Sequence, residues 1–98
     1  MPFMYIVRCS DDSYYVGSTW DLERRLIQHN SGFAAKYTST RCPVTLEFYE
    51  EYDRIEDAFR REKQVQGWGR AKREALMRGD VGELRKLSRS RQARPPEE

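Results

Sequence analysis

The sequence is short of the residues that cross-link small proteins or bind zinc, with two cysteines and one histidine among its 98 residues. Cys9 and Cys42 lie far apart and form no CxxC motif. An extracellular disulfide framework is therefore not expected, and a reducing cytoplasm is the predicted location. His29, the only histidine, cannot build a zinc site without cysteines spaced to help it. These shortages argue against a disulfide scaffold and against a zinc module.

Long apolar runs are also absent. The longest apolar stretches fall far short of the roughly 20 residues that a membrane-spanning helix needs. No basic segment followed by an apolar run opens the chain. The length corresponds to one domain that can fold without cross-links, and no internal repeat is visible. We expect a cytoplasmic protein that makes no contact with a membrane.

The net charge of +2 conceals an uneven distribution. Residues 1–69 carry nine Lys and Arg against eleven Asp and Glu, whereas residues 70–94 carry nine against three. A basic segment beside a slightly acidic body suits an anionic polymer as partner. A solvated basic tail that only aids solubility is the alternative that charge alone leaves open.

Two short strands joined by a polar turn are predicted at the start of the chain. Phe3–Cys9 is nearly continuous in apolar residues, Ser10–Ser13 favours a turn, and Tyr14–Ser18 is rich in aromatic and β-branched residues. Each strand carries a tyrosine, Tyr5 or Tyr15, where an aliphatic residue would serve a core equally well. The pattern predicts a β-hairpin whose first strand is buried on both faces.

The direction in which these two tyrosines point depends on the length of the turn. If Cys9 pairs with Tyr14 across a four-residue loop, Tyr5 and Tyr15 point to opposite faces, because side chains alternate with period two. Only an odd loop or a β-bulge brings them to one face. A site shared by both tyrosines therefore predicts one of these irregularities.

A helix is predicted over residues 20–31. Leu22 and Leu26 form its apolar face, and Arg25 and His29, also four residues apart, form an adjoining stripe. An arginine beside a buried edge is more often a residue whose stem covers apolar surface than one that binds a ligand. Both readings of Arg25 stay open at this point.

The polar segment over residues 33–43 is predicted to be a loop, and residues 44–50 a third, half-exposed strand. The loop mixes aromatic, hydroxyl and cationic side chains, which is typical of a surface that contacts phosphate. The candidate contacts are Lys36, Tyr37, Thr38 and Arg41. Packing within the loop is the more common role for such tyrosine and threonine residues.

A second long helix is predicted from the capping-box-like pair Asp53 and Glu56 to about Gln66. Glu62 lies within its apolar stripe, the other members of which are Ile55, Ala58, Phe59 and Val65. A carboxylate in a buried stripe is costly unless it is paired or binds a cation. A salt bridge to an arginine and a metal site are both consistent with this position.

The C-terminal part is predicted to be helical and then disordered. Gly67-Trp68-Gly69 ends the long helix, a basic helix follows over residues 70–78, and a short helix over 80–87. The chain from Ser88 onward has almost no apolar residues and is predicted to be disordered. The predicted domains are residues 1–79 and a basic C-terminal segment, 80–98. The predicted class is α/β in the α+β sense, a three-stranded, largely antiparallel sheet flanked by helices in the order ββαβαα.

This ordered set of elements and residues resembles the GIY-YIG nuclease domain. Phe3-Met4-Tyr5 corresponds to the first half of the motif that names the family, and Tyr15-Val16-Gly17 to the second. Arg25 and His29 lie on the first helix, and Glu62 lies on the helix after the third strand, where the family has its functional residues. Small stand-alone bacterial members of the family are the most similar.

The resemblance covers about residues 3–78 and implies an endonuclease that hydrolyses DNA phosphodiester bonds, structure-selective in repair or recombination, with Mg²⁺ or Mn²⁺ as cofactor. Glu62 would hold the metal, because Mg²⁺ tolerates a single carboxylate completed by water and phosphate. Arg25 would brace the phosphate with two hydrogen bonds.

The resemblance also implies that Tyr5 or Tyr15 acts as general base toward the attacking water. A phenol has a pKa of about 10, so nearby cations must lower it for this role. His29 would relay the proton or contact phosphate, and Gly17 would allow a close approach of the backbone.

Two departures from the family pattern concern the first motif and the last helix. Phe3 and Met4 replace the Gly and Ile of the motif, and no asparagine follows Asn30, although many members have one late in the domain. The candidate substitutes for this asparagine are Gln66, Lys72 and Arg73. Further DNA or RNA contacts are expected from the basic residues Arg70, Lys72 and Arg73.

Two other functions remain possible from the sequence. One is a nucleic-acid-binding module that keeps the fold without turnover, and the other is an adaptor that binds repair proteins through its basic tail. Loss of cleavage with retained DNA affinity after substitution of Glu62 separates the nuclease from the binding module.

Overall fold

The computed structural model describes the backbone of residues 1–93 and the side chains of residues 1–88. Its elements fall into two compact units, one on each side of the boundary between Gln66 and Gly67. Within residues 1–93, none of the helices has the length and apolar character that a membrane crossing demands. In chain order the elements are β1 (Phe3–Arg8), β2 (Tyr14–Thr19), α1 (Leu22–Asn30), α2 (Lys36–Ser39), β3 (Thr45–Glu51), α3 (Ile55–Gln66), α4 (Arg70–Arg78) and α5 (Val81–Ala93).

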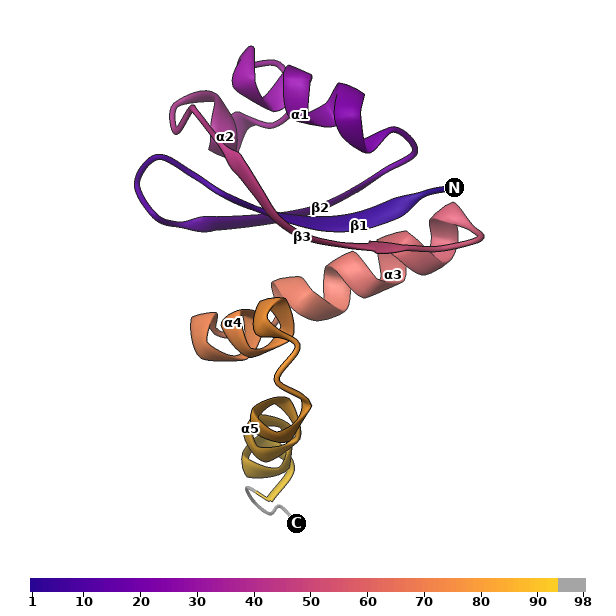
Figure 1. Ribbon diagram of the computed structural model, residues 1–98, viewed down its shortest axis with the longest axis vertical. Helices are drawn as coiled ribbons and strands as arrows, with labels where there is room; N and C mark the ends of the chain where they lie inside the picture. The colour runs from indigo at the N-terminus through magenta and orange to yellow at the C-terminus, as the bar shows by residue number, and fades with distance from the viewer. Residues whose placement is uncertain (94–98) are drawn as a thin grey trace. The chain divides into compact units, whose positions relative to one another are not determined.

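The first unit is built on a three-stranded antiparallel sheet with the strand order β2-β1-β3. Figure 1 shows α1 over one face of this sheet and α3 over the other. Four consecutive residues of the central strand β1 are fully buried, namely Met4, Tyr5, Ile6 and Val7. Successive side chains of a strand point to opposite faces, so β1 is covered on both. The predicted fold class and the doubly buried first strand are confirmed.

The turn of the β1–β2 hairpin has five residues, because Arg8 rather than Cys9 pairs with Tyr14. The backbone N–H of Cys9 donates to the carbonyl of Ser13 at 2.8 Å, which closes the turn. Asp12 has a φ of 68°, a left-handed conformation that aspartate adopts more readily than most residues. The alternative of a four-residue turn is therefore wrong.

The odd turn sets the register on which the site depends. Tyr5 pairs with Gly17, and Val7 pairs with Tyr15. Directly paired residues of antiparallel strands share a face, as do residues two apart on one strand. Tyr5 and Tyr15 therefore lie on the same face of the sheet, which is the condition that a shared site requires.

The two faces of the sheet are covered by different helices. On the α1 face a buried cluster of Tyr5, Val7, Cys9 and Val44 packs against Tyr15, Leu22, Leu26 and Leu46. On the opposite face α3 reaches both outer strands, through a hydrogen bond from Ser18 to Glu62 and an ion pair between Arg61 and Glu50.

Helix α2 lies in the segment predicted to be a loop, so that prediction is wrong for residues 36–39. It is a single turn whose hydroxyls bond to the backbone: Thr38 donates to the carbonyl of Ala35 at 3.2 Å and Ser39 to that of Lys36 at 2.7 Å. A four-residue helix is too short to produce the periodicity from which helices are predicted.

On α3 the predicted apolar stripe is correct except at Phe59, whose side chain is 50% exposed. Ala58, Glu62 and Val65 are spaced by four and three residues and are buried on one face. Phe59 lies about 100° further round the helix than Ala58 and is covered partly by the Lys63 ammonium, 4.7 Å from its ring centroid.

The second unit consists of α4 and α5. α4 ends at Gly79, which has the left-handed φ of 71° expected of a helix-ending glycine. α5 continues to Ala93, beyond the short helix predicted over residues 80–87; the disorder predicted from Ser88 onward stays a prediction, and residues 94–98 lie outside the described residues. Its last turns contain helix-favouring residues and no proline, so no residue stops the helix before Arg94. The domain boundary at residue 79 stays a prediction.

Candidate active site

Tyr5, on strand β1 of the hairpin, points into the core on the α1 face of the sheet and has no exposed surface. Its hydroxyl lies against the backbone of Gly17, where a Cβ would be 2.5 Å from the hydroxyl oxygen and 2.7 Å from Cζ. Any side chain at this position would collide with the tyrosine ring. Gly17 is therefore required for space, which explains why a glycine ends the second half of the motif.

His29, in the last turn of α1, is also fully buried. Its Nε2 lies 2.8 Å from the hydroxyl of Tyr5, and its Nδ1 lies 2.8 Å from Oγ1 of Thr38. Burial, reinforced by the positive charge of Arg25, lowers the pKa of His29 to about 4. The imidazole is therefore neutral at pH 7, so one nitrogen donates a hydrogen bond and the other accepts one.

Tyr15 is half-buried and contacts the same imidazole. Its ring meets that of His29 edge to face with 5.3 Å between centroids, and it stacks on Tyr37 at 6.0 Å. Burial raises the pKa of Tyr15, the negative charge of Glu62 raises it further, and Arg25 lowers it. Tyr5 and Tyr15 thus both lie against His29.

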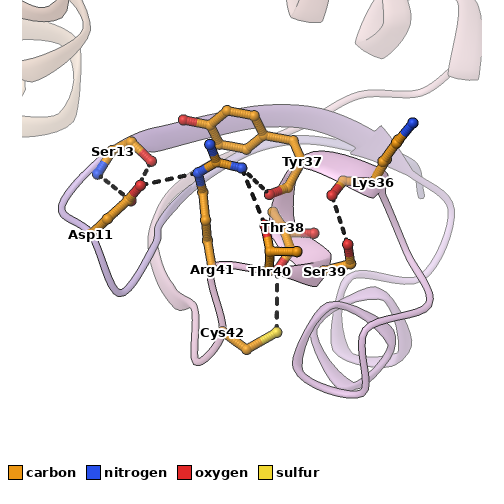
Figure 2. Close-up of polar contacts among 9 residues, drawn as sticks. All are labelled: Asp11, Ser13, Lys36, Tyr37, Thr38, Ser39, Thr40, Arg41 and Cys42. Atoms are coloured by element: carbon orange, nitrogen blue, oxygen red, sulfur yellow. Dashed lines mark hydrogen bonds and ion pairs between the residues drawn. The ribbon is translucent and has the colours of Figure 1, made fainter.

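A side-chain cluster extends from Tyr37 of α2 to the hairpin turn (Figure 2). The guanidinium carbon of Arg41 lies 4.0 Å from the centroid of the Tyr37 ring. Its Nε is 3.0 Å from the carboxylate of Asp11, and another of its nitrogens donates to the carbonyl of Tyr37 at 2.8 Å. Arg41 therefore ties α2 to the turn that follows β1.

Arg25 is the cation that acts on both tyrosines. It is half-buried on α1, where its Nε donates to Oε1 of Gln28 at 3.1 Å. Burial raises the pKa of Tyr5 to about 12, although the charge of Arg25 lowers it. Both phenols are therefore protonated at neutral pH in the protein alone.

Glu62 of α3 is the carboxylate of the site and is only 8% exposed. The hydroxyl of Ser18 donates to its Oε1 at 2.6 Å, and the amide of Gln66 donates to its Oε2 at 2.7 Å. The ammonium of Lys63 is further away, at 3.8 Å. The charge of Glu62 raises the pKa of Tyr5 and that of Tyr15, so the carboxylate is within electrostatic reach of both tyrosines although it hydrogen-bonds on the opposite face of the sheet.

The groups around Glu62 fit only one way of binding a divalent cation. In the part of the chain that the structure describes, no three His, Cys, Asp or Glu side chains gather closely enough to hold a metal ion. Each Glu62 oxygen accepts one hydrogen bond from a neutral group and keeps a further lone pair. Mg²⁺ is commonly held by one or two carboxylates, with water and substrate phosphate completing its shell. Glu62 fits that mode and does not fit a site closed by protein ligands.

The structure brings most of the predicted catalytic residues together. Tyr5, Tyr15 and His29 are in direct contact, and Arg25 and Glu62 act on the tyrosines through their charges. The predicted nucleic-acid contacts at Arg70, Lys72 and Arg73 lie in the second unit, on α4.

One predicted nucleic-acid contact is wrong. Thr38 has no exposed surface and hydrogen-bonds to His29, so it cannot reach a nucleic acid from this position. Lys36 and Tyr37 are exposed, as the prediction requires, and Arg41 is half-buried against Asp11. The sequence pattern placed all four in one polar segment and could not separate the inward-facing threonine from its neighbours.

Little in the sequence indicates that Ser18 and Gln66 hydrogen-bond to Glu62. Ser18 follows Gly17 on the face opposite the tyrosines, and its contact with Glu62 depends on how α3 crosses the sheet. Gln66 was a candidate for the missing asparagine, and its amide bridges Glu62 and the carbonyl of Val16, at 2.7 and 3.1 Å. Gln66 lies four residues after Glu62, a spacing that favours such a contact on a helix.

A small antiparallel sheet that joins two hairpin tyrosines to an arginine, a histidine and a helix carboxylate has the form of a nuclease-type catalytic domain. The model of the GIY-YIG catalytic domain matches residues 1–75. The chain belongs to the GIY-YIG family, as the resemblance predicted.

Similar proteins, somewhat shorter than this chain, occur in archaea and bacteria. A UPF0213 protein of Halobacterium salinarum is 46% identical over 76 residues, which cover 78% of this chain and 99% of that protein. A UPF0213 protein of Staphylococcus saprophyticus is 41% identical over 75 residues, 76% of this chain and 92% of that protein. The solution NMR structure of the UPF0213 protein BH0048 from Bacillus halodurans has a TM-score of 0.50 and 40% identity, and the match covers 78% of this chain and 82% of that one.

Proposed function

We propose that this protein is a divalent-metal-dependent endonuclease that hydrolyses phosphodiester bonds in DNA. One observation carries the proposal: Glu62 is a nearly buried carboxylate held by neutral donors, and its charge reaches both hairpin tyrosines. The one cation recorded beside Glu62 in the described residues, the ammonium of Lys63 at 3.8 Å, is beyond hydrogen-bond distance, whereas a buried carboxylate with a purely structural role would be expected to have a hydrogen-bonded cationic partner. Hydrolysis of a phosphodiester needs an anionic metal ligand, a cation for the phosphate and a proton acceptor for water.

Glu62 would hold Mg²⁺ or Mn²⁺, with Ser18 and Gln66 fixing the direction of its oxygens. The metal, when bound, supplies positive charge for the oxygens of the scissile phosphate. Hydrogen bonds that orient a metal ligand usually influence affinity for the metal. Gln66 has this role in the proposal, in place of the late asparagine.

Arg25 would bind a phosphate oxygen of the substrate. Its guanidinium is half-buried, donates to Gln28 through Nε and also hydrogen-bonds the hydroxyl of Tyr5; a guanidinium has five N–H donors, so others can bind a phosphate. The same positive charge lowers the pKa of Tyr5 and of Tyr15. Arg25 therefore both neutralises phosphate charge and favours deprotonation of a tyrosine.

Either tyrosine is a candidate general base, and each has one property that the role requires and lacks another. The hydroxyl of Tyr5 has an acceptor for its own proton, Nε2 of His29 at 2.8 Å, but the side chain is fully buried. Tyr15 is half-buried and can be reached by a water molecule, but its contacts with His29 and Tyr37 are through the ring. General-base groups typically contribute 10²- to 10⁴-fold to the rate.

The proposed DNA contacts of the first unit are the exposed residues of α2. Lys36 is exposed, and Tyr37 presents a 39% exposed side chain beside the candidate base Tyr15. Arg41 is half-buried, and the basic residues of α4, Arg70, Lys72 and Arg73, are candidate phosphate contacts in the second unit. Branched or damaged DNA is the proposed substrate class, and RNA is the alternative polymer.

The test of the proposal is a cleavage assay over linear, nicked, flapped and four-way-junction DNA and the matching RNA strands, each with Mg²⁺, with Mn²⁺ and with a chelator. Tyr5→Phe and Tyr15→Phe are compared with Tyr14→Phe, because Tyr14 is a tyrosine of the same strand on the opposite face. We expect metal-dependent nicking. Substitution of whichever tyrosine is the general base, Tyr5→Phe or Tyr15→Phe, should reduce its rate by about 10²- to 10⁴-fold, while Tyr14→Phe cleaves at the wild-type rate.

The outcomes separate the candidate functions. Binding to one of these polymers without cleavage under any metal condition would favour the non-catalytic binding module. Failure to bind any of them would favour an adaptor. Cleavage that persists in both tyrosine variants would overturn the assignment of the base even if the protein is a nuclease.

A further inference from the structure

We infer that Thr38 is a positioning residue that holds His29 in the Nδ1–H tautomer, with Nε2 free to accept the proton of Tyr5. The inference deepens the proposed function and rests on it for its catalytic meaning. Three short contacts carry it: Tyr5 to His29 at 2.8 Å, His29 to Thr38 at 2.8 Å, and Thr38 to the carbonyl of Ala35 at 3.2 Å.

The direction of the three hydrogen bonds follows from the groups that form them. The carbonyl of Ala35 can only accept, so the hydrogen in that contact comes from the hydroxyl of Thr38. That hydroxyl has a single hydrogen and must therefore accept from Nδ1 of His29. A neutral imidazole protonated at Nδ1 has its lone pair at Nε2, where it accepts from Tyr5.

The opposite arrangement leaves one buried donor, the hydroxyl of Tyr5, without an acceptor. If Nε2 carried the hydrogen, Thr38 would have to donate to Nδ1, and its contact with the carbonyl of Ala35 would contain no hydrogen. The hydroxyl of Tyr5 would then receive a hydrogen from His29, and its own hydrogen would point away from the imidazole. Tyr5, His29 and Thr38 are all fully buried, and a buried polar group without a partner costs about 1–3 kcal/mol.

The backbone around Thr38 is held in a way that keeps this geometry. The thiol of Cys42 lies 3.2 Å from the carbonyl oxygen of Thr38 (Figure 2). It also lies 3.0 Å from the carbonyl oxygen of His29, so it connects the end of α1 to α2. The N–H of Ser39 donates to the carbonyl of Ala35 at 3.0 Å, which closes the single turn of α2. The hydroxyl of Thr38 is thus fixed by the turn that contains it.

The tautomer decides what Tyr5 can do. With its hydrogen directed to Nε2, the hydroxyl oxygen of Tyr5 can accept hydrogen bonds, and Arg25 is one of its donors. If that oxygen takes a proton from the attacking water, its own O–H bond breaks and an N–H bond forms at Nε2, so His29 becomes the imidazolium and Tyr5 stays neutral. In the other tautomer Nε2 has no lone pair, and this transfer is impossible.

The tautomer can be measured directly, because His29 is the only histidine in the chain. Long-range ¹H–¹⁵N correlation of the imidazole at pH 7 distinguishes a protonated from an unprotonated ring nitrogen. We expect hydrogen at Nδ1 in the wild type and in Thr38→Ser, which keeps the hydroxyl. In Thr38→Val, which keeps the shape and removes the hydroxyl, the Nδ1–H loses its acceptor, and we expect the fraction of the Nε2–H tautomer to rise above that of the wild type. Hydrogen at Nε2 in the wild type, or the same tautomer ratio in Thr38→Val as in the wild type, would overturn the inference.

The second measurement is the cleavage rate of the same three proteins. Thr38→Val should reduce kcat by about 10- to 100-fold, a typical effect for residues that orient a functional group, with little change in KM, and Thr38→Ser should restore most of the rate. Thr38→Val with wild-type kcat would contradict the catalytic part of the inference. If the wild type cleaves nothing while the tautomer changes as expected, the proposed function fails and the positioning role of Thr38 stands.

Discussion

Substitution of Gly17 by alanine should destabilise the protein through a collision that the structure locates. The new Cβ would lie 2.5 Å from the Tyr5 hydroxyl oxygen, 2.7 Å from Cζ and 3.0 Å from Cε2. The ring cannot swing away freely, because it is fully buried and its hydroxyl is bonded to His29 at 2.8 Å. The perturbation therefore forces either β2 or the ring of Tyr5 to move.

The expected magnitude combines three effects. Overpacking a core by one methyl group costs about 1–3 kcal/mol, and loss of the Tyr5–His29 hydrogen bond adds about 1 kcal/mol. Replacing a glycine restores about 0.4–1 kcal/mol by restricting the unfolded chain. We expect Gly17→Ala to reduce the free energy of unfolding by about 2 kcal/mol, which corresponds to a Tm decrease on the order of 10 °C for a domain of this size.

The assay is urea unfolding followed by circular dichroism, with Gly82→Ala as the control. Gly82 is in α5, where a Cβ would lie 3.7 Å from the side chain of Asp80, an ordinary van der Waals distance. Alanine should be neutral or stabilising by up to about 1 kcal/mol there. If Gly17→Ala unfolds at the same urea concentration as the wild type, the proposed packing of Tyr5 on β2 is wrong.

Three further predictions concern pH, phosphate binding and the basic C-terminal segment. The pKa of His29 is about 4 in the folded protein and 6.5 ordinarily, so between these pH values the unfolded chain binds a proton that the folded protein does not. The free energy of unfolding should therefore fall by up to about 3 kcal/mol as the pH decreases from 6.5 to 4. In urea unfolding, His29→Gln should lack this pH-dependent decrease. Arg25→Lys should reduce cleavage by about 100-fold, because an ammonium cannot replace bidentate phosphate binding; wild-type kcat in this variant would contradict the role of Arg25. Removal of residues 85–98 should reduce the slope of log affinity against log salt concentration by about 0.9 for each lost phosphate contact, and an unchanged slope would show that this segment does not contact the nucleic acid.

The fold was largely predictable because its elements have strong local patterns. The apolar run of β1, the alternation in β3 and the i, i+4 spacing in α1 and α3 identify four elements of the first unit. The family motif added the candidate functional residues, and strand parity showed that a shared tyrosine face requires either an odd turn or a β-bulge. Glu62 was recognisable because a charged residue within an apolar stripe is costly without a partner.

The parts that could not be predicted depend on tertiary contacts. Thr38 resembles its polar neighbours in composition, and only the packing of α2 against α1 shows that its hydroxyl points to His29. Phe59 belongs to an apolar stripe in the sequence, but it lies at the edge of the buried face because α3 covers the sheet with Ala58 and Val65. The single turn of α2 is stabilised by hydroxyl–carbonyl bonds that produce no periodic pattern.

The most direct test of the nuclease site is single-turnover nicking by Glu62→Gln in Mg²⁺, on whichever DNA the wild type cleaves fastest. Glu56→Gln is the matched control, because Glu56 is an exposed glutamate in the first turn of the same helix. We predict that Glu62→Gln binds this DNA with wild-type affinity and does not nick it, while Glu56→Gln nicks at the wild-type rate. Equal nicking by Glu62→Gln and the wild type would contradict the assignment of Glu62 as the metal ligand and, with it, the proposed mechanism.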